Sequence, residues 1–238
     1  MCGRYSLAAP SSQITEAFEL ETENLLSEKR YNIAPTQFAP FVYINEENKR
    51  TINKTRFGFI PSWWAHTKET LFKPPLGSTF NARDDKLFSS GYWKKSIIAK
   101  RALLPATGFY EWQKSDGEKL PYYFRLKNEN ELFAFGAVYS IWKVPDNYKF
   151  FQKSKNDAIF TAAIITTEAN ENTKAIGHLR HPLIIDRANY DAWLNHDLSE
   201  AELKSLIKPF LPDKMIYFRV SKAVNSVKNE SEDLIRKI

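Results

Sequence analysis

Short apolar stretches rich in β-branched and aromatic residues recur along the chain, and polar turns bound most of them. This pattern is typical of β-strands. The triplet Ser115-Asp116-Gly117 stands between two such stretches and predicts a tight hairpin turn. Strands are expected over residues 39–44, 50–60, 97–105, 109–112, 121–126, 132–139, 158–166, 182–185 and 217–220.

Fewer segments have the spacing of a helix. Residues 11–26 place Ile14 and Phe18 near one face and begin with two serines that can serve as N-cap. A capping box is expected where Ser199 precedes Glu202 by three positions. The other helices are expected over residues 168–175, 190–195 and 199–206.

Two loops stand out between these elements. Residues 31–35 are expected to be an extended loop, because a residue that precedes proline avoids the α region. Residues 61–81 form a second loop, and loops of this length are often functional. No repeat, low-complexity block or linker divides the chain. We therefore predict a single α+β domain over residues 1–238, with a mainly antiparallel, barrel-like β core, peripheral helices and a short charged tail over 228–238.

Composition narrows the class of protein. Aromatic residues make up 14% of the chain, which favours a β-rich core. The one cysteine rules out an intramolecular disulfide and suits a reducing compartment. No apolar run of about 18 residues and no signal-peptide core is found. We expect a cytoplasmic protein, nucleoid-associated if bacterial, with no membrane partner and a monomeric state.

The charge balance permits an anionic partner without requiring one. The net charge is +6, and residues 89–101 carry four cations and no acid. Aromatic and basic residues are interleaved in one part of the chain, at Trp63, Trp64, Lys68, Lys73, Arg83 and residues 92–95. This mixture suits single-stranded nucleic acid, because bases stack on rings while cations follow phosphates. The alternative is that these tryptophans are core residues.

Cys2 is the most unusual residue because it directly follows Met1. Removal of Met1 would leave an α-amine and a thiol on one residue. Such a pair condenses with an aldehyde to an imine and closes to a thiazolidine. The same position also suits an N-terminal nucleophile that forms thioesters. The isolated groups titrate near pH ~8 and ~8.5, so either reaction needs a local base or positive field.

Other polar residues could supply that environment, and each also has an ordinary structural explanation. Arg4 could stabilise a thiolate or bind phosphate, or simply belong to an N-terminal strand. Asn81 and Arg83 could orient a carbonyl or phosphodiester, or form a turn cap and an ion pair with Asp84 or Asp85. Glu111 lies among aromatic residues, where burial would raise its pKa, although most strand glutamates face solvent.

His178 is the candidate proton shuttle, because histidine titrates near neutral pH. The alternative is a structural histidine in the loop that ends a helix. His178 shares a face with Arg180 if the segment is extended. No cysteine cluster or HExxH pattern accompanies His178 and His181, so a metal site is not predicted. The sequence also has no Gly-rich phosphate loop and no G-x-S-x-G motif.

Taken in order, several motifs resemble the SOS-response-associated peptidase (SRAP) family, proteins that crosslink abasic sites in single-stranded DNA. The similarity covers residues 2–227. The motifs that carry it are Met1-Cys2-Gly3-Arg4-Tyr5, Tyr31-Asn32-Ile33-Ala34-Pro35, Gly58-Phe59-Ile60-Pro61-Ser62-Trp63, Asn81-Ala82-Arg83, residues 101–112 and His178-Leu179-Arg180-His181-Pro182.

The resemblance implies a set of catalytic roles. Met1 is removed by self-processing or by an aminopeptidase, and Cys2 captures the ring-opened aldehyde as a thiazolidine. Glu111 acts as general acid and base, His178 assists opening of the sugar ring, and Asn81 positions the terminus and the sugar. Autopeptidase (hydrolase) activity and a possible lyase activity are implied, with neither metal nor cofactor.

The resemblance also implies how single-stranded DNA with abasic sites is held. Arg4, Arg83 and Arg180 hold the flanking phosphates, while Pro35 and Trp63 act as wedges that split the base stack. The chain departs from the usual family pattern at Arg56-Phe57-Gly58, Asp84-Asp85 and Arg180-His181-Pro182, and in a long loop over 65–79. None of these departures touches the four catalytic candidates.

Two other functions would also use parts of this sequence. Glutamine amidotransferases of the N-terminal nucleophile class also begin Met-Cys-Gly, but an aliphatic residue usually follows where this chain has Arg4, and no Asn-Gly-Glu motif is found. A non-catalytic single-stranded nucleic-acid binder is the second alternative. Ammonia release from glutamine tests the first, and the effect of Cys2→Ala on DNA behaviour tests the second.

Overall fold

The first of two sheets contains the N-terminal strand, which pairs with a strand on either side. The computed structural model describes residues 2–21, 28–64, 79–129, 131–144 and 158–238. This sheet has the order β13-β8-β7-β1-β2, and every pairing in it is antiparallel. Its strands are β1 (Tyr5–Leu7), β2 (Arg30–Ile33), β7 (Gly108–Ser115), β8 (Glu118–Leu126) and β13 (Met215–Arg219).

The second sheet closes on itself. Its order is β11-β10-β4-β3-β6-β9-β12, and β9 also pairs with β10, so β10, β4, β3, β6 and β9 form a closed barrel. Only the pairings of β10 with β4 and with β5 are parallel among the described strands, which confirms the mainly antiparallel core. The bounds are β3 (Phe38–Ile44), β4 (Arg50–Phe57), β5 (Asn81–Arg83), β6 (Arg101–Ala106), β9 (Phe133–Lys143), β10 (Ala158–Glu168), β11 (Arg180–Pro182) and β12 (Ile184–Ile185).

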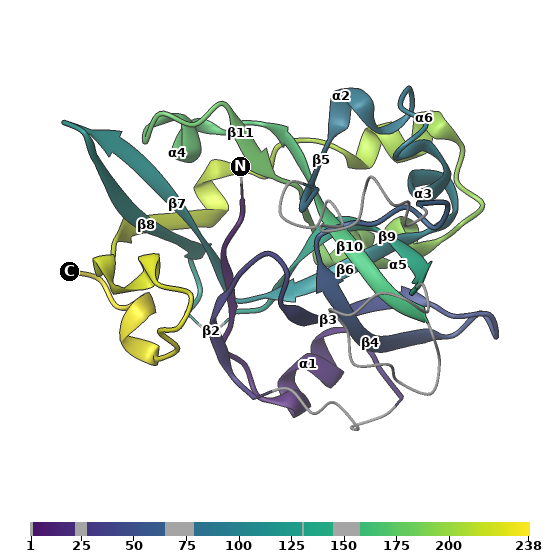
Figure 1. The fold of residues 1–238 in the computed structure, drawn as a ribbon, viewed down its shortest axis with the longest axis horizontal. Coiled ribbons are helices and arrows are strands. Elements are labelled where there is room, and N and C mark those ends of the chain that lie inside the picture. Colours follow the sequence, from purple (N-terminus) through teal and green to yellow (C-terminus); the bar gives the residue numbers. More distant parts are fainter. Residues whose placement is uncertain (1, 22–27, 65–78, 130, 145–157) are drawn as a thin grey trace.

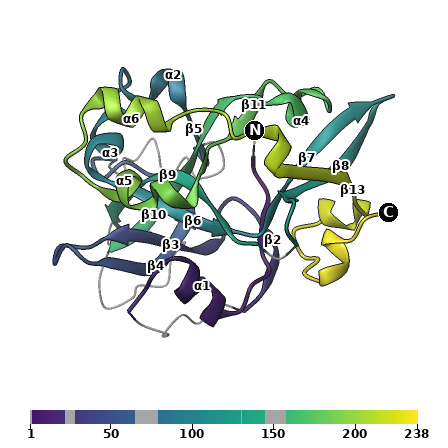
Figure 2. The same ribbon diagram turned by 180° about the vertical axis from the view of Figure 1, so that it is seen from behind.

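Short helices surround this β core. Figures 1 and 2 show α2, α3, α5 and α6 on the side of the barrel away from the β7–β8 hairpin. No helix in the described part of the chain is long and apolar enough to cross a membrane. The α-helices are α1 (Ser11–Ala17), α2 (Asp84–Leu87), α3 (Lys94–Ala99), α4 (Glu171–Lys174), α5 (Tyr190–Leu194) and α6 (Glu200–Leu206), and the 3-10 helices are η2 (Arg187–Asn189), η3 (Pro212–Lys214), η4 (Lys222–Asn225) and η5 (Glu232–Ile235).

A hydrophobic core joins the two sheets. The ring of Tyr5 on β1 meets Phe57 of the barrel edge-on at 5.6 Å and Phe135 at the same centroid distance. Phe109 on β7 stacks on Phe124 at 4.9 Å. Because edge-on ring pairs add to the stabilisation from burial, Tyr5 fastens β1 of the first sheet to the barrel. The residues just before β1 are thereby fixed in place.

Two local predictions are confirmed. Asp116 and Gly117 have φ angles of +49° and +78°, as a two-residue hairpin turn between β7 and β8 requires. The turn pairs Ser115 with Glu118. At α6 the Ser199 side chain accepts from the Glu202 backbone N–H while the Glu202 carboxylate bonds back to the cap.

The predicted strand over residues 97–105 is wrong in its first part. Residues 94–99 form α3, and the strand begins only at Arg101. The Arg101 guanidinium is buried and donates to the carbonyls of Ile97 and Ile98 at 2.7 and 2.6 Å. It thus satisfies carbonyls that the end of a helix leaves free. Isoleucines in a short run favour a strand by local propensity. The helix forms instead because the Arg101 side chain, which also donates to the distant Trp193 carbonyl at 2.8 Å, turns back onto these carbonyls.

Other boundaries also differ from the prediction. The N-cap of α1 is Pro10 rather than a serine, and the helix ends where Glu19 takes a φ of +51°. Residues 31–33 belong to β2 and not to an extended loop, because β1 offers them a pairing partner. The strand expected over 182–185 is divided between β11 and β12, which pair with different barrel strands. The helix expected over 168–175 is confined to residues 171–174 because β10 runs to residue 168 and Asn170 caps α4.

The C-terminal segment packs back on the first sheet. Val224 and Leu234 are buried in a small cluster with Tyr110 and Tyr123. The last backbone N–H, of Ile238, donates to the Arg219 carbonyl at 3.1 Å. The segment expected to be a charged tail therefore packs on the first sheet through Leu234, while most of its charged side chains stay exposed.

Candidate functional site

Cys2 lies just before β1 and is completely buried. The Asn81 side-chain amide donates to the Cys2 carbonyl at 3.1 Å, while the Cys2 thiol faces the Arg4 carbonyl at 3.9 Å. Gly3 lies close to Phe80, and a Cβ at this position would be a tight 3.1 Å from its ring. Burial raises the pKa of the Cys2 thiol, and the Glu111 carboxylate raises it further. The sulfur is therefore a neutral thiol at neutral pH.

Asn81 reaches Cys2 because β5 runs parallel to the barrel strand β10. Asn81 is paired with Ile164 in that register, and its Nδ2 lies 3.5 Å from the Ile164 carbonyl. Its Oδ1 is buried and has no hydrogen-bond donor within the described ranges. The Asn81 Nδ2 therefore holds the N-terminal backbone, while its Oδ1 can still accept a hydrogen bond from another group.

Glu111 and His178 form the second half of the site. Glu111 lies on β7 and is 2% exposed, and its Oε2 is 3.5 Å from Nε2 of His178. Burial raises the pKa of the Glu111 carboxyl, and His178 opposes this shift. A buried carboxyl with a raised pKa can give and take a proton closer to neutral pH than a solvated one.

The orientation of His178 follows from its backbone contact. Its Nε2 lies 3.0 Å from the Trp112 carbonyl, which can only accept, so Nε2 carries the hydrogen. Nδ1 is then the nitrogen that takes up a proton. The residue is presented by Gly177, whose φ of +83° lets the chain turn sharply after α4. The end of a short helix therefore aims this imidazole at Glu111.

An open pocket of about 550 Å³ joins this pair to a group of cations. Lys114 and Lys119 face each other across the β7–β8 hairpin, and neither forms an ion pair with a described residue. Like charges in directly opposed positions of a sheet disfavour each other. The sequence reasoning missed both lysines, although the predicted hairpin turn already placed them opposite one another. The pocket is lined by Arg4, Glu111, Trp112, Lys114, Lys119, His178 and Asn225.

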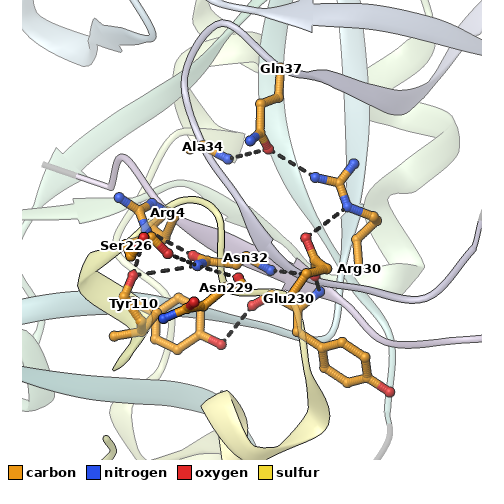
Figure 3. Close-up of polar contacts among 11 residues, drawn as sticks. Arg4, Arg30, Asn32, Ala34, Gln37, Tyr110, Ser226, Asn229 and Glu230 are labelled. Atoms are coloured by element: carbon orange, nitrogen blue, oxygen red, sulfur yellow. Dashed lines mark hydrogen bonds and ion pairs between the residues drawn. The ribbon is translucent and has the colours of Figure 1, made fainter. Parts of the chain in front are cut away.

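Arg4 lines the same pocket but is held by the protein. Its NH1 donates to Asn32 Oδ1 at 2.8 Å and to the Val224 carbonyl at 2.7 Å, as Figure 3 shows. Its guanidinium lies 5.7 Å from the centre of the Trp112 ring. Trp112 in turn donates to Asn225 Oδ1 at 2.7 Å. Arg4 is thus a fixed positive charge beside the site.

The two other arginines proposed from the sequence already have carboxylate partners. Arg180 donates to Asp84 at 2.6 Å and also contacts Thr166. Arg83 forms a two-pronged contact with Asp85 at 2.9 and 2.8 Å, the ion pair considered as its ordinary explanation. Exposed pairs of this kind are weak, so a phosphate can compete for Arg83 at small cost.

The two wedge candidates differ in their surroundings. Pro35 lies in a turn closed by a 3.2 Å bond from the Gln37 N–H to the Ala34 carbonyl. The Trp63 side chain is 60% exposed and meets Tyr92 edge-on at 6.1 Å. Of the other residues in the predicted long loop, 65–78 lie outside the described ranges.

The remaining aromatic residues of the basic stretches belong to the interior. The ring of Trp64 packs edge-on against Trp142 at 5.6 Å, and its carbonyl accepts from Trp142 Nε1. Trp93 is 9% exposed and packs on Phe59 at 4.9 Å. The core explanation therefore applies to Trp64 and Trp93, and Trp63 remains as an exposed ring. Lys68 and Lys73 are not among the described residues.

His181 differs sharply from His178. It is completely buried on β11 against Phe109, and neither ring nitrogen has a hydrogen-bond partner in the described structure. Burial lowers the pKa of His181 to about 3. No group of metal-binding side chains was found among the described residues. His181 is therefore a neutral core residue.

Several curated proteins are similar to the chain over most of its length. The chain is 34% identical over 241 residues to the abasic site processing protein YoqW of Bacillus subtilis (strain 168), covering 99% of both chains. It is 33% identical to YoaM of the same organism, with coverage of 99% and 97%, and 27% identical to chicken (Gallus gallus) HMCES, with coverage of 80% and 58%. Both are also named abasic site processing proteins.

Solved structures show the same fold. A crystal structure from Bacteroides thetaiotaomicron superposes with a TM-score of 0.83 at 23% identity, covering 100% of both chains. Another, from Bordetella bronchiseptica, gives 0.73 at 16% identity, covering 92% of this chain and 100% of that one. The model of the SOS response associated peptidase family matches residues 1–227. The chain therefore belongs to the SOS response associated peptidase (SRAP) family.

Proposed function

We propose that this protein processes abasic sites in single-stranded DNA by capturing the ring-opened deoxyribose on Cys2. The observation that carries the proposal is the position of Cys2. It is buried, its carbonyl accepts from the Asn81 amide, and its thiol is near enough to the Glu111 carboxylate for that charge to raise the thiol pKa. The names of the relatives support the choice of an abasic site as substrate. A 1,2-aminothiol is formed once Met1 is removed.

The chemistry balances without an oxidant. The Cys2 amine adds to the C1′ aldehyde to give a carbinolamine, and loss of one water leaves an imine. The thiol then adds to the imine carbon and its proton passes to nitrogen, which closes the thiazolidine. Protonation of the leaving hydroxyl needs an acid, and the raised pKa of Glu111 suits that role. His178 is the group that moves a proton on the sugar-ring oxygen as the ring opens.

The pocket supports recognition of the DNA backbone. Arg4 supplies a fixed charge at the inner end of the pocket, and Lys114 and Lys119 extend it along the hairpin. Arg83 and Arg180 hold the flanking phosphates, with their carboxylate partners giving way to the anion. Trp63 and Pro35 separate the bases that flank the lesion. Salt should weaken this binding because phosphate contacts release counterions.

The decisive experiment incubates mature protein with an oligonucleotide that contains one abasic site. Denaturing electrophoresis should show a shifted band, and intact mass should equal the sum of protein and DNA less one water. The same DNA with a normal base should give no shift. Cys2→Ala should bind without forming the band. Absence of the adduct from protein that has lost Met1 rejects the proposal.

The same samples separate the two alternatives. A non-covalent nucleic-acid binder would leave the behaviour of Cys2→Ala identical to that of the parent in every DNA assay. An amidotransferase would release ammonia from glutamine and lose this activity in Cys2→Ala. Turnover of glutamine would therefore overturn the assignment of Cys2 to aldehyde capture.

A further inference from the structure

Glu230 connects the C-terminal segment to β2. One carboxylate oxygen accepts from the backbone N–H groups of Tyr31 and Asn32, the latter at 3.0 Å. The other oxygen accepts from Arg30 Nε at 3.0 Å. Figure 3 shows these contacts converging on the carboxylate. A side chain from beyond the family match, which ends at residue 227, therefore satisfies three donors on one strand.

Asn32 strengthens the same junction. Its Nδ2 donates to the carbonyls of Ser226 and Asn229, each at 2.9 Å, while its Oδ1 accepts from Arg4. Asn32 is completely buried, and buried polar groups of this kind fix their partners in one arrangement. Asn32 thus anchors the segment on the N-terminal side of Glu230.

The contacts of Glu230 continue to the Pro35 turn. Arg30 uses its NH2 to donate to Gln37 Oε1 at 2.9 Å, and the same oxygen accepts from the Ala34 N–H at 3.1 Å. Gln37 therefore spans the turn from inside, as the upper part of Figure 3 shows. An unbroken path of hydrogen bonds leads from Glu230 through Arg30 and Gln37 to the residue before Pro35.

This turn needs support because of its backbone. Thr36 has a φ of +75°, in the left-handed region that residues with a Cβ rarely occupy. Its N–H donates to the Phe57 carbonyl at 2.7 Å, which ties one side of the turn to β4. Such conformations persist where several contacts with the surrounding structure hold them. The Gln37 side chain provides a second contact, because its Oε1 accepts from the Ala34 N–H.

We infer that Glu230 is a positioning residue for DNA binding, which acts through Arg30 and Gln37 to hold the Pro35 turn in its binding conformation. The inference rests on the proposed function, since it takes Pro35 as a contact with DNA. A turn that is already ordered loses less conformational freedom when DNA binds. The chemical step at Cys2 does not depend on Glu230.

The direction in which Glu230→Gln changes DNA affinity distinguishes a positioning role from a simple effect of charge. Glu230→Gln removes a negative charge and loses the acceptor for Arg30, while one oxygen remains for the backbone N–H groups. Charge alone predicts tighter binding to DNA, because the protein becomes more positive. Positioning predicts weaker binding. Asp233→Asn is the matched control, because it makes the same charge change in the same segment and its carboxylate contacts Arg236.

The test measures two quantities at a temperature well below the melting transition. Anisotropy with single-stranded DNA that carries a tetrahydrofuran analogue gives the dissociation constant without reaction. Single-turnover adduct formation at saturating protein gives the rate constant on a true abasic site. We expect Glu230→Gln to raise the dissociation constant about five-fold and to leave the rate constant within about two-fold. Asp233→Asn should raise neither.

A double-mutant cycle tests the path itself. Gln37→Leu should weaken DNA binding by a similar factor. The double variant should bind DNA no less tightly than the single variant with the larger dissociation constant, because both substitutions interrupt the same path of hydrogen bonds. Two results would overturn the inference if the parent still forms its adduct. One is losses of DNA affinity that add in the double variant, and the other is unchanged or tighter DNA binding by Glu230→Gln. Failure of the parent to form any adduct would instead reject the proposed function and this inference with it.

Discussion

The carboxylate of Glu111 lies 3.5 Å from Nε2 of His178, and that nitrogen is also within 3.0 Å of the Trp112 carbonyl. Both groups line the same open pocket, although Glu111 is only 2% exposed. The Glu111 carboxylate also raises the pKa of the buried Cys2 thiol. The pair therefore lies between the open pocket and the buried thiol.

Glu111→Gln tests the acid in this pair. The substitution keeps the shape of the side chain but removes the proton that imine formation and reversal require. We expect both rates to fall about 100-fold, a typical contribution of a general acid or base, with little change in DNA affinity. Single-turnover gels and anisotropy measure the two effects. Equal rates in variant and parent would contradict the role given to Glu111.

The same substitution should change stability with a predictable sign. Burial raises the pKa of Glu111, so the folded state holds this proton to a higher pH than the unfolded state. Its contribution is therefore favourable below the unfolded pKa and is lost as pH rises through the folded one. Glu111→Gln should be more stable than the parent by about 1 kcal/mol at pH 8 and show a smaller gain at pH 4. Thermal melts at both pH values check this.

His181→Met tests the buried histidine that has no partner. Its pKa is lowered from 6.5 to about 3, so the unfolded state binds the extra proton and folding loses stability as pH falls below 6.5. At about 1.4 kcal/mol per pH unit, the loss reaches roughly 4–5 kcal/mol near pH 3. The variant should resist acid unfolding by a large part of that amount. Identical acid midpoints would show that His181 is not neutral in the folded protein.

Asn81→Ala tests the anchor of the N-terminal backbone. The variant loses the 3.1 Å bond to the Cys2 carbonyl, so the amine and thiol should sample more orientations. We expect adduct formation to slow at least about 10-fold while DNA affinity is retained, because misplaced reacting groups lose rate steeply. Asn172→Ala is a matched control, since that amide also donates to a backbone carbonyl, of Pro212, at 2.8 Å. A loss in both variants would point to folding rather than positioning.

Lys114→Gln combined with Lys119→Gln tests the extension of the pocket along the hairpin. If each lysine neutralises one phosphate, the slope of log affinity against log salt should fall by about 1.4 on single-stranded DNA. Lys204→Gln, on α6 at the far side of the barrel from the hairpin, should leave the slope unchanged. An unchanged slope in the hairpin variant would remove these lysines from the DNA path.

Much of the fold could be predicted from the sequence. The Ser115-Asp116-Gly117 turn, the Ser199–Glu202 capping box and most barrel strands depend on local propensity and on neighbours within a few positions. Residues 94–99 could not be predicted in this way. The guanidinium of nearby Arg101 caps the helix, but its orientation depends on the Trp193 carbonyl, 92 positions along the chain. Local patterns carry no record of such a distant partner.

The same distinction applies to the candidate site. By itself the sequence determined which groups are available for chemistry: one thiol beside the N-terminus, and the side chains of Asn81, Glu111 and His178 in recognisable motifs. Only the tertiary structure decided that Glu111 is buried and paired with His178, and that His181 is a core residue.

The partners of Arg4 show the physical reason. One of its hydrogen bonds reaches the Val224 carbonyl, 220 positions along the chain, and another reaches Asn32, 28 positions along the chain. The identity of a basic residue does not reveal whether its side chain binds a phosphate or a backbone carbonyl. Its partner is chosen by how the sheets and the C-terminal segment pack, because packing determines which acceptors are brought within reach and which charges lose their water.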